Sequence, residues 1–353
     1  MTSKSGIHTY SVSKELTFRQ YAEIRKNASG YGQPYQSSWN GEEKSTIKRT
    51  YRFEQFPGIH LTLYDIMKDE YNAGIKRVNI QIEPCQVLGD TDPAALFSPT
   101  RENYRALLRH LESVFTILAV PGDPDTMPIC RVDVTKNFFL ESSAMVQSYL
   151  HVFKKSLIPR DYRLEKFRQG KAKDPQRANQ HSHCIKANHV TVLVYDKIDQ
   201  LKMIGREDER VTRNAILRVE VQMKRKKFQQ YVSENAMRNR AILKELYRQR
   251  ETILKGYFKK MGLTLGDHFI YERAKQQIKR NIKKPEQQAR MLLLLRKCSD
   301  CQNLTQAIKY LKEKTRVSTK QINAILEKFR KLGVSPISLP NANGLIFLPQ
   351  LGR

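Results

Sequence analysis

Three short segments alternate apolar and polar side chains with the period of a β-strand; they span residues 129–135, 189–197 and 216–222. Because side chains alternate across a strand, valines of one parity can face a core while their neighbours face the other side. The outer two segments share an Arg-x-acid pattern, Arg131 with Asp133 and Arg218 with Glu220, and the middle one carries Tyr195. The pattern predicts three strands that present two carboxylates and one tyrosine.

Further elements follow from periodicity along the rest of the chain. Residues 58–65 and 77–84 alternate as an antiparallel strand pair. Apolar residues recur at helical spacing over 101–118, and another helix is predicted around 142–157. A polar, basic loop is expected over 171–186. No fixed-period internal repeat is evident.

Strand patterns nearly vanish after residue 230. The predicted divisions are a polar N-terminal segment at 1–50, a sheet domain at 51–230 and a basic helical domain at 231–353. In the last of these, Ser318 and Gln321 match a capping box, and Gly333 matches a helix stop. With the helix before it, this forms a helix-turn-helix-like pair, which either docks DNA or is plain helical packing.

Charge narrows the class of partner. The 353 residues include 63 Lys and Arg against 35 Asp and Glu, a formal net charge of +28. Such an excess favours a polyanionic partner, above all nucleic acid. Five cysteines do not suggest a disulfide framework, and the longest apolar run, 291–295, is too short to cross a bilayer. We therefore expect a soluble, cytoplasmic protein without a membrane partner.

Tyr195 is a candidate nucleophile for phosphodiester chemistry. A phenol with a pKa of about 10 reacts poorly at neutral pH, so it needs a metal ion, a cation or a base beside it. Strand alternation predicts that Tyr195 shares a polar face with His189 and Lys197, opposite the valines of that strand. Lys197 is then expected near the phenol.

The two carboxylates suggest a metal site. Asp133 and Glu220 are expected to offer oxygen ligands to Mg²⁺ or Mn²⁺, and His189 a nitrogen ligand or an acid or base. Arg131 and Arg218 would either neutralise phosphates or hold the carboxylates in place. An antiparallel sheet with one solvated face, on which these residues form cross-strand pairs, explains the same pattern without a site.

Three other polar clusters could have a function. The basic run after the last strand is either a track for DNA phosphates or a solvated face, and it consists of Lys224, Arg225, Lys226 and Lys227. The group His181, His183 and Cys184 lies in the predicted basic loop and is not expected to bind metal. Cys298 and Cys301 form a single CxxC without a second pair, so a zinc site is not expected.

Four stretches together resemble a known family; they are residues 78–88, 130–134, 189–197 and 216–222. In order and spacing they resemble the filamentous-phage gene II and gene X type of replication initiator. They are more distantly similar to plasmid rolling-circle initiators with a rearranged, HUH-like endonuclease fold. The resemblance implies an α+β fold, with an antiparallel-sheet nicking domain followed by a basic helical domain. It identifies Tyr195 as the nucleophile and matches the two Arg-x-acid strands, whereas His189 has no counterpart.

The resemblance also implies a reaction. Tyr195 would attack the origin phosphate of one strand, leaving a 3′-hydroxyl primer and a 5′-phosphotyrosyl link that is later resealed, with no ATP or nicotinamide. The implied partners are single-stranded or supercoiled origin DNA and the host replication helicase and polymerase. Two alternatives stay open: a relaxase of a mobile element, and a non-enzymatic DNA-binding or copy-control protein.

Overall fold

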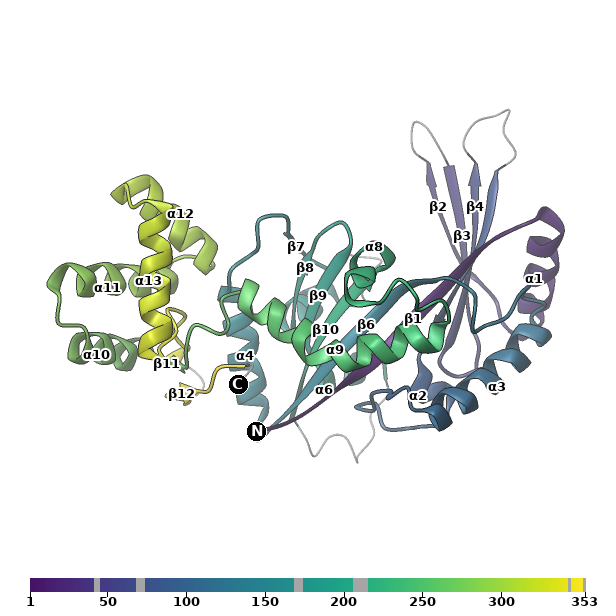
Figure 1. Ribbon diagram of the computed structural model, residues 1–353, viewed down its shortest axis with the longest axis horizontal. Coiled ribbons are helices and arrows are strands. Elements are labelled where there is room, and N and C mark those ends of the chain that lie inside the picture. The colour runs from purple at the N-terminus through teal and green to yellow at the C-terminus, as the bar shows by residue number, and fades with distance from the viewer. Residues whose placement is uncertain (41–44, 68–73, 168–173, 206–214, 342–343, 352–353) are drawn as a thin grey trace. The chain divides into compact units, whose positions relative to one another are not determined.

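The computed structural model describes residues 1–40, 45–67, 74–167, 174–205, 215–341 and 344–351. It shows an α+β protein with a large antiparallel sheet (Figure 1). The chain forms two compact units. Unit 1 comprises Met1–Lys4, Lys136–Val221 and Glu251–Arg353, and unit 2 comprises Ser5–Thr135 and Gln222–Arg250.

Ten strands follow one another in the hydrogen-bonded order β2-β3-β4-β5-β1-β6-β10-β9-β8-β7. Their bounds are β1 Thr2–Leu16, β2 Tyr35–Asn40, β3 Ser45–Arg52, β4 Ile59–Met67, β5 Ile75–Ile82, β6 Ile129–Leu140, β7 Arg163–Glu165, β8 Ser182–Lys186, β9 Val190–Asp196 and β10 Ala215–Lys224. A separate pair joins β11 (His268–Phe269) to β12 (Phe347–Leu348).

In unit 2, strands β2, β3, β4, β5 and β1 pair antiparallel in that order. The predicted strand pair is thus confirmed as β4 and β5. Alternate residues of these strands, such as Leu61, Leu63, Val78 and Ile80, are buried, which fixes the register because a one-residue slip would expose them. The unit also contains helices α1 (Phe18–Tyr31), α2 (Pro84–Val87), α3 (Arg101–Ile117) and α8 (Arg225–Phe228).

In unit 1, β7, β8 and β9 pair antiparallel, and α4 (Ser143–Lys155) packs against β8 and β9. Two short helices, α5 (Pro175–Gln180) and α6 (Lys197–Met203), flank the strands. The apolar face of α4 is buried because Tyr149, Val152 and Phe153 recur at helical spacing. A long helix, α9 (Asn239–Lys260), follows the sheet in the chain and contributes residues to both units.

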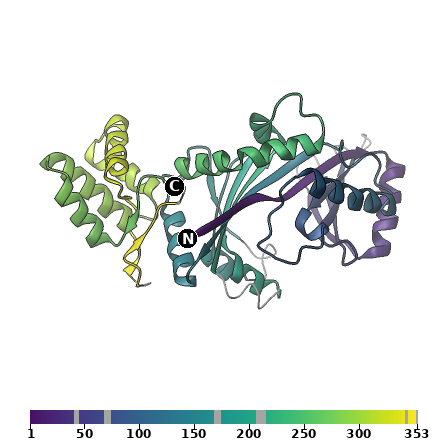
Figure 2. The same cartoon turned by 60° about the horizontal axis from the view of Figure 1, so that its bottom comes forward.

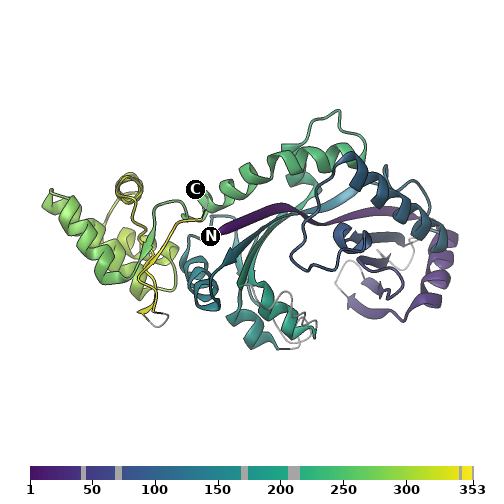
Figure 3. The same cartoon turned by 90° about the horizontal axis from the view of Figure 1, so that it is seen from below.

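Four further helices of unit 1 gather into a compact cluster, seen in green to yellow in Figures 2 and 3. They are α10 (Tyr271–Asn281), α11 (Pro285–Asp300), α12 (Leu304–Thr315) and α13 (Thr319–Leu332). The predicted capping box of Ser318 and Gln321 is confirmed, and Gly333 ends α13 in the left-handed conformation at φ 70°. Ile322, Ile325 and Phe329 are buried, so the apolar stripe of α13 serves packing. Among the described helices, none combines the length and apolarity required to cross a membrane.

One sequence-based expectation about local structure is wrong, and one long strand is not predicted at all. The predicted basic loop over 171–186 instead contains α5 and β8, because a cluster of polar residues there hides the buried face of a short strand. The predicted polar N-terminal segment contains the 15-residue strand β1, whose middle is buried. Alternation does not reveal this strand, because the hydroxyl residues Thr9 and Ser11 are buried together with Tyr10 and Val12.

Both units build their strands in the same order, although no repeat is evident from the sequence. Unit 2 reads β2-β3-β4-β5-β1, and the second half of the sheet reads β7-β8-β9-β10-β6. In each, a long first strand is followed by a helix, α1 or α4, whose first turn is capped by a hydroxyl side chain, Thr17 or Ser142. The topology of the chain is therefore duplicated.

Candidate functional site

The strand β9 places Tyr195 on its polar side, as the alternation predicts. Val190, Val192 and Val194 are buried, whereas Tyr195 is half-buried on the opposite face. The hydroxyl of Tyr195 donates a 2.7 Å hydrogen bond to Oε1 of Glu220, which lies on β10. Both residues belong to unit 1. The phenol and one of the two predicted carboxylates are thus in direct contact.

The environment keeps the phenol of Tyr195 neutral. Burial raises its pKa well above the ordinary value of 10, and the negative charge of Glu220 raises it further. The positive charge of Arg218 acts in the opposite direction and lowers the pKa, but does not cancel the increase. A carboxylate that accepts the phenol's hydrogen bond is also the group best placed to receive its proton.

Arg218 lies two residues before Glu220 on β10 and is completely buried. Its Nε donates a 2.7 Å hydrogen bond to Oδ1 of Asn137, which is on β6 and is also completely buried. A buried guanidinium is costly unless its donors are used, so the Asn137 amide fixes where this charge sits. Arg218 thereby supplies a fixed positive charge beside the Tyr195–Glu220 pair.

Arg131 holds the other predicted carboxylate. Its Nε and Nη2 donate to the two oxygens of Asp133 at 2.7 and 2.6 Å, a bidentate ion pair within β6. The side chain of Asp133 is buried, whereas that of Arg131 is one-third exposed. Of the two roles considered for Arg131, holding the carboxylate is the one the geometry provides. Both residues belong to unit 2, so a site shared by Asp133 with Tyr195 and Glu220 remains a prediction.

Two residues lie elsewhere than expected. His189 is exposed and precedes β9, which begins at Val190. At about 3.3 Å per residue it lies about 20 Å from Tyr195 along the strand, so the shared face does not bring the two together. Lys197 is buried as the first residue of α6, and its Nζ donates to Oε1 of Gln200 at 2.8 Å. The strand ends before Lys197, because Asp196 caps α6 by accepting from the backbone of the first turn.

The described residues do not gather three His, Cys, Asp or Glu side chains into a group that could hold a metal ion. Both oxygens of Asp133 bind Arg131, and Oε1 of Glu220 binds Tyr195. This arrangement does not by itself fit the Mg²⁺ or Mn²⁺ expected from sequence. The metal requirement therefore stays a prediction.

The other histidines and cysteines are dispersed. His183 is buried on the face of β8 opposite to Ser182, which pairs with Tyr195, and its pKa is lowered to about 4 by burial. His181 precedes the strand and contacts Gln147. Cys298 and Cys301 are free thiols at the end of α11.

The basic run continues directly from β10. Lys224, Arg225 and Lys226 are exposed, and Lys227 donates to Gln230 at 2.6 Å and lies 5.7 Å from the Tyr231 ring centre. The exposed part of the run is compatible with either earlier interpretation, a phosphate track or a solvated face.

Asn137 is the site residue that the sequence analysis misses. The predicted strand ends at Thr135, whereas β6 continues to Leu140. Because alternation continues, Asn137 shares a strand face with Asp133, and this parity is the signal that could have identified it. Asn137 is uncharged and lies between Lys136 and Phe138 in the sequence, so no charge pattern reveals it.

Comparison of the chain with family models and with curated proteins finds no match.

Proposed function

We propose that this protein nicks and rejoins one strand of DNA through a phosphotyrosine intermediate on Tyr195, as an initiator of rolling-circle replication. The observation that carries the proposal is the 2.7 Å hydrogen bond from the Tyr195 hydroxyl to Glu220. Support also comes from the fixed charge of Arg218 and from the net charge of +28, which favours a nucleic-acid substrate.

In the cleavage step, Oη of Tyr195 attacks the phosphorus of one phosphodiester. Its proton passes to Oε1 of Glu220, and the bond from phosphorus to the 3′ oxygen breaks. The departing 3′ oxygen takes up a proton and becomes a 3′-hydroxyl, while the 5′ phosphate stays on Tyr195. In the rejoining step, a 3′-hydroxyl attacks the same phosphorus, and Tyr195 leaves and regains a proton. One phosphoester replaces another, so no nucleotide hydrolysis is needed.

Glu220 and Arg218 can compensate for the low reactivity of a neutral phenol as a nucleophile. Because the pKa of Tyr195 is raised, the phenolate is rare at neutral pH, and proton transfer must accompany attack. A positioned general base contributes about 100- to 10,000-fold to such a step. The positive charge of Arg218 opposes the negative charge that builds up on the phenol oxygen and the phosphoryl group. Asn137 positions that charge.

Several parts of the proposal rest on the sequence. They are the metal roles of Asp133, Glu220 and His189, the contribution of Lys197, the DNA contacts of the basic run, and the partnership with a host helicase and polymerase. Chelation with EDTA, followed by addition of Mg²⁺ or Mn²⁺, tests the metal requirement. A relaxase would use the same tyrosine on a different origin.

A second candidate, a DNA-binding protein without nicking activity, is favoured by one observation. The Tyr195 hydroxyl is satisfied internally by Glu220, as in a purely structural tyrosine. Incubating the protein with single-stranded oligonucleotides and Mg²⁺ or Mn²⁺ separates the two. The nicking proposal predicts a covalent adduct that Tyr195→Phe abolishes and Tyr310→Phe, on α12, retains. DNA binding without any adduct would favour the second candidate.

A further inference from the structure

The duplicated topology extends to individual residues. Aligning β5 with β10 matches Arg77-Val78-Asn79-Ile80-Gln81 with Arg218-Val219-Glu220-Val221-Gln222, and aligning β4 with β9 matches Tyr64-Asp65 with Tyr195-Asp196. The first strands match as Val12-Ser13-Lys14-Glu15 and Val134-Thr135-Lys136-Asn137. In the β5–β10 pair the matched residues share the alternation of polar and apolar side chains, although the polar residues Arg218 and Glu220 of β10 are buried.

A contact that occurs at matched positions in both copies supports the alignment. In unit 1, Arg218 donates to Asn137. In unit 2, the matched residues Arg77 and Glu15 lie opposite each other in the β1–β5 ladder, and Nη2 of Arg77 donates to Oε1 of Glu15 at 2.8 Å. An arginine on the fifth strand therefore bonds to the same position of the first strand in each copy.

Unit 2 keeps the tyrosine and arginine of the candidate site but lacks its carboxylates. Tyr64 lies opposite Arg77 in the β4–β5 ladder. The position of Glu220 is taken by Asn79, whose amide donates to the Cys130 sulfur at 3.1 Å, and that of Asp133 by Ser11. Burial raises the pKa of Tyr64, and the Cys130 side chain raises it further while Arg77 lowers it. Without a carboxylate in the place of Glu220, Tyr64 has no matching proton acceptor.

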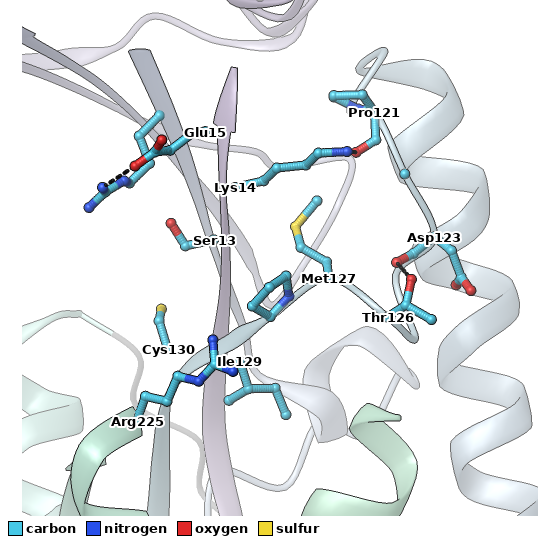
Figure 4. A pocket seen from close by; sticks show the side chains of 13 residues that line it. Ser13, Lys14, Glu15, Pro121, Asp123, Thr126, Met127, Ile129, Cys130 and Arg225 are labelled. Carbon is cyan, nitrogen blue, oxygen red and sulfur yellow. Dashed lines mark hydrogen bonds and ion pairs between the residues drawn. The ribbon is translucent and has the colours of Figure 1, made fainter. Parts of the chain in front are cut away.

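A cleft of about 530 Å³ opens on this second copy (Figure 4). Arg77, Glu15 and Cys130 line it, together with Lys14 and Arg225. The Lys14 ammonium binds the Pro121 carbonyl at 3.3 Å on one side. The Arg225 side chain extends over Ile129 and Cys130 (Figure 4), and no described residue accepts a hydrogen bond from its guanidinium.

The charges of the cleft favour an anionic ligand. Three cations, those of Lys14, Arg77 and Arg225, face two carboxylates, those of Glu15 and Asp123. One oxygen of Asp123 accepts from the backbone N–H of Asp125 at 2.7 Å, and the Glu15 carboxylate pairs with Arg77, so the cations of Lys14 and Arg225 have no carboxylate partner among the residues lining the cleft. A planar guanidinium to which the described part of the chain offers no acceptor, such as that of Arg225, is suited to bidentate contact with a phosphate.

We propose that this cleft is a second DNA site, which binds the phosphodiester backbone of a single strand without cutting it. The inference rests on the proposed function for the identity of the ligand as DNA. The copy that kept the tyrosine and arginine has this cleft beside Arg77, whereas Asn79 and Ser11 stand in the places of the acid groups that cleavage would use. One chain would then hold two DNA segments, one at a cutting site and one at a holding site.

Photo-crosslinking of the full chain tests this proposal directly. The Tyr195→Phe variant, which cannot cut, is irradiated with single-stranded DNA containing 4-thiothymidine, and crosslinked peptides are identified by mass spectrometry. We expect crosslinks in residues 9–16, 59–82 or 121–131, in addition to any in residues 136–221. Crosslinks confined to residues 136–221 would overturn the second site. Crosslinks in unit 2 from a protein that never forms an adduct would support this site while the nicking proposal fails.

Charge substitutions test the same site in solution. Loss of one phosphate contact should reduce the slope of log affinity against log salt by about 1. We expect this smaller slope for Arg225→Gln. We expect Glu15→Gln to bind DNA more tightly, because it frees the Arg77 side chain from its ion pair. The matched variants Arg109→Gln and Glu112→Gln, on the exposed face of α3, have the same charge changes and should alter binding far less. If the cleft variants and the α3 variants change DNA affinity and its salt dependence equally, only the overall charge of the protein matters. That result would overturn the proposed second DNA site. A covalent DNA adduct on Tyr64 in the Tyr195→Phe variant would show that the second site can cut DNA and would contradict the proposal that it only binds.

Discussion

Tyr195 donates its hydroxyl hydrogen to Glu220 over 2.7 Å, so the candidate nucleophile is bound to the group that can take its proton. The same contact raises the pKa of the phenol and offers a route for deprotonation during attack. If the pair is catalytic, its loss should slow DNA cleavage and leave DNA binding intact. If the pair is only structural, its loss should weaken both.

Replacing Glu220 by Gln should slow cleavage without weakening DNA binding. The amide keeps the size of the side chain but cannot take up a proton, so we expect a loss of about 100- to 10,000-fold in the single-turnover nicking rate. Affinity for the same oligonucleotide, measured by fluorescence anisotropy, should change little. Glu327→Gln, at a partly exposed position of α13, is the matched control. Equal losses of cleavage and binding would argue that Glu220 is structural.

Asn137→Ala should destabilise the protein by about 1–3 kcal/mol, because the completely buried Arg218 loses the acceptor of its Nε hydrogen. Urea unfolding followed by circular dichroism measures the effect. Asn281→Ala, at the exposed end of α10, should cost about 0.5 kcal/mol or less. If both variants unfold at the same urea concentration, Asn137 does not hold the buried charge in place.

Buried histidines predict a loss of stability in mild acid. His268 is buried, its pKa is lowered from 6.5 to about 4 by burial, and its Nδ1 lies 3.1 Å from the carbonyl of Ile337. The fold favours the neutral ring, so this contribution is fully present above pH 6.5 and is lost as the pH falls from 6.5 towards 4. Complete loss amounts to about 3 kcal/mol.

Urea unfolding between pH 7 and pH 4.5 tests this dependence. The stability of His268→Gln should fall less steeply with decreasing pH than that of the parent, although the variant starts from a lower value. His110→Gln, on the exposed surface of α3, should keep the parent's slope. Parallel curves for the parent and His268→Gln would contradict the prediction.

Asn239 anchors the first turn of α9 in unit 2. Its buried side-chain amide donates to the carbonyls of Pro124 and Met127 at 2.9 and 2.8 Å. Asn239→Ala should therefore lower the free energy of unfolding by about 1–3 kcal/mol, measured by urea denaturation. Asn235→Ala, at an exposed position four residues earlier, is the control. If Asn239→Ala and Asn235→Ala are equally stable, the attachment of α9 to the loop at Pro124 and Met127 does not depend on the Asn239 amide.

The sequence predicts strands and helices where the period is strong. The valine alternation around Tyr195 and the apolar stripe of α13 are both confirmed, because each buries one continuous face. The strand β8 and the long strand β1 are missed, since buried polar residues interrupt their apolar pattern: Ser182 and His183 in β8, and Thr9 and Ser11 in β1. The duplication is also missed: its two copies share topology and a few positions, but no fixed spacing.

The candidate site is only partly predictable. Alternation places Tyr195 and Glu220 on polar faces, yet the bond between them depends on the pairing of strands far apart in the chain. His189 is misplaced because sharing a strand face does not mean contact: it precedes β9 and lies six residues, about 20 Å along the strand, from Tyr195. Asn137 carries no charge and lies beyond the predicted strand, so only the three-dimensional contact with Arg218 reveals it.

The most direct test of the central claim is to identify the residue that becomes linked to DNA. The parent protein is incubated with single-stranded origin-region DNA and Mg²⁺ or Mn²⁺, the adduct is digested with nuclease and protease, and the modified peptide is sequenced by mass spectrometry. We predict a 5′-nucleotide on the hydroxyl of Tyr195. A nucleotide on another residue, or an undiminished adduct in Tyr195→Phe, would contradict it.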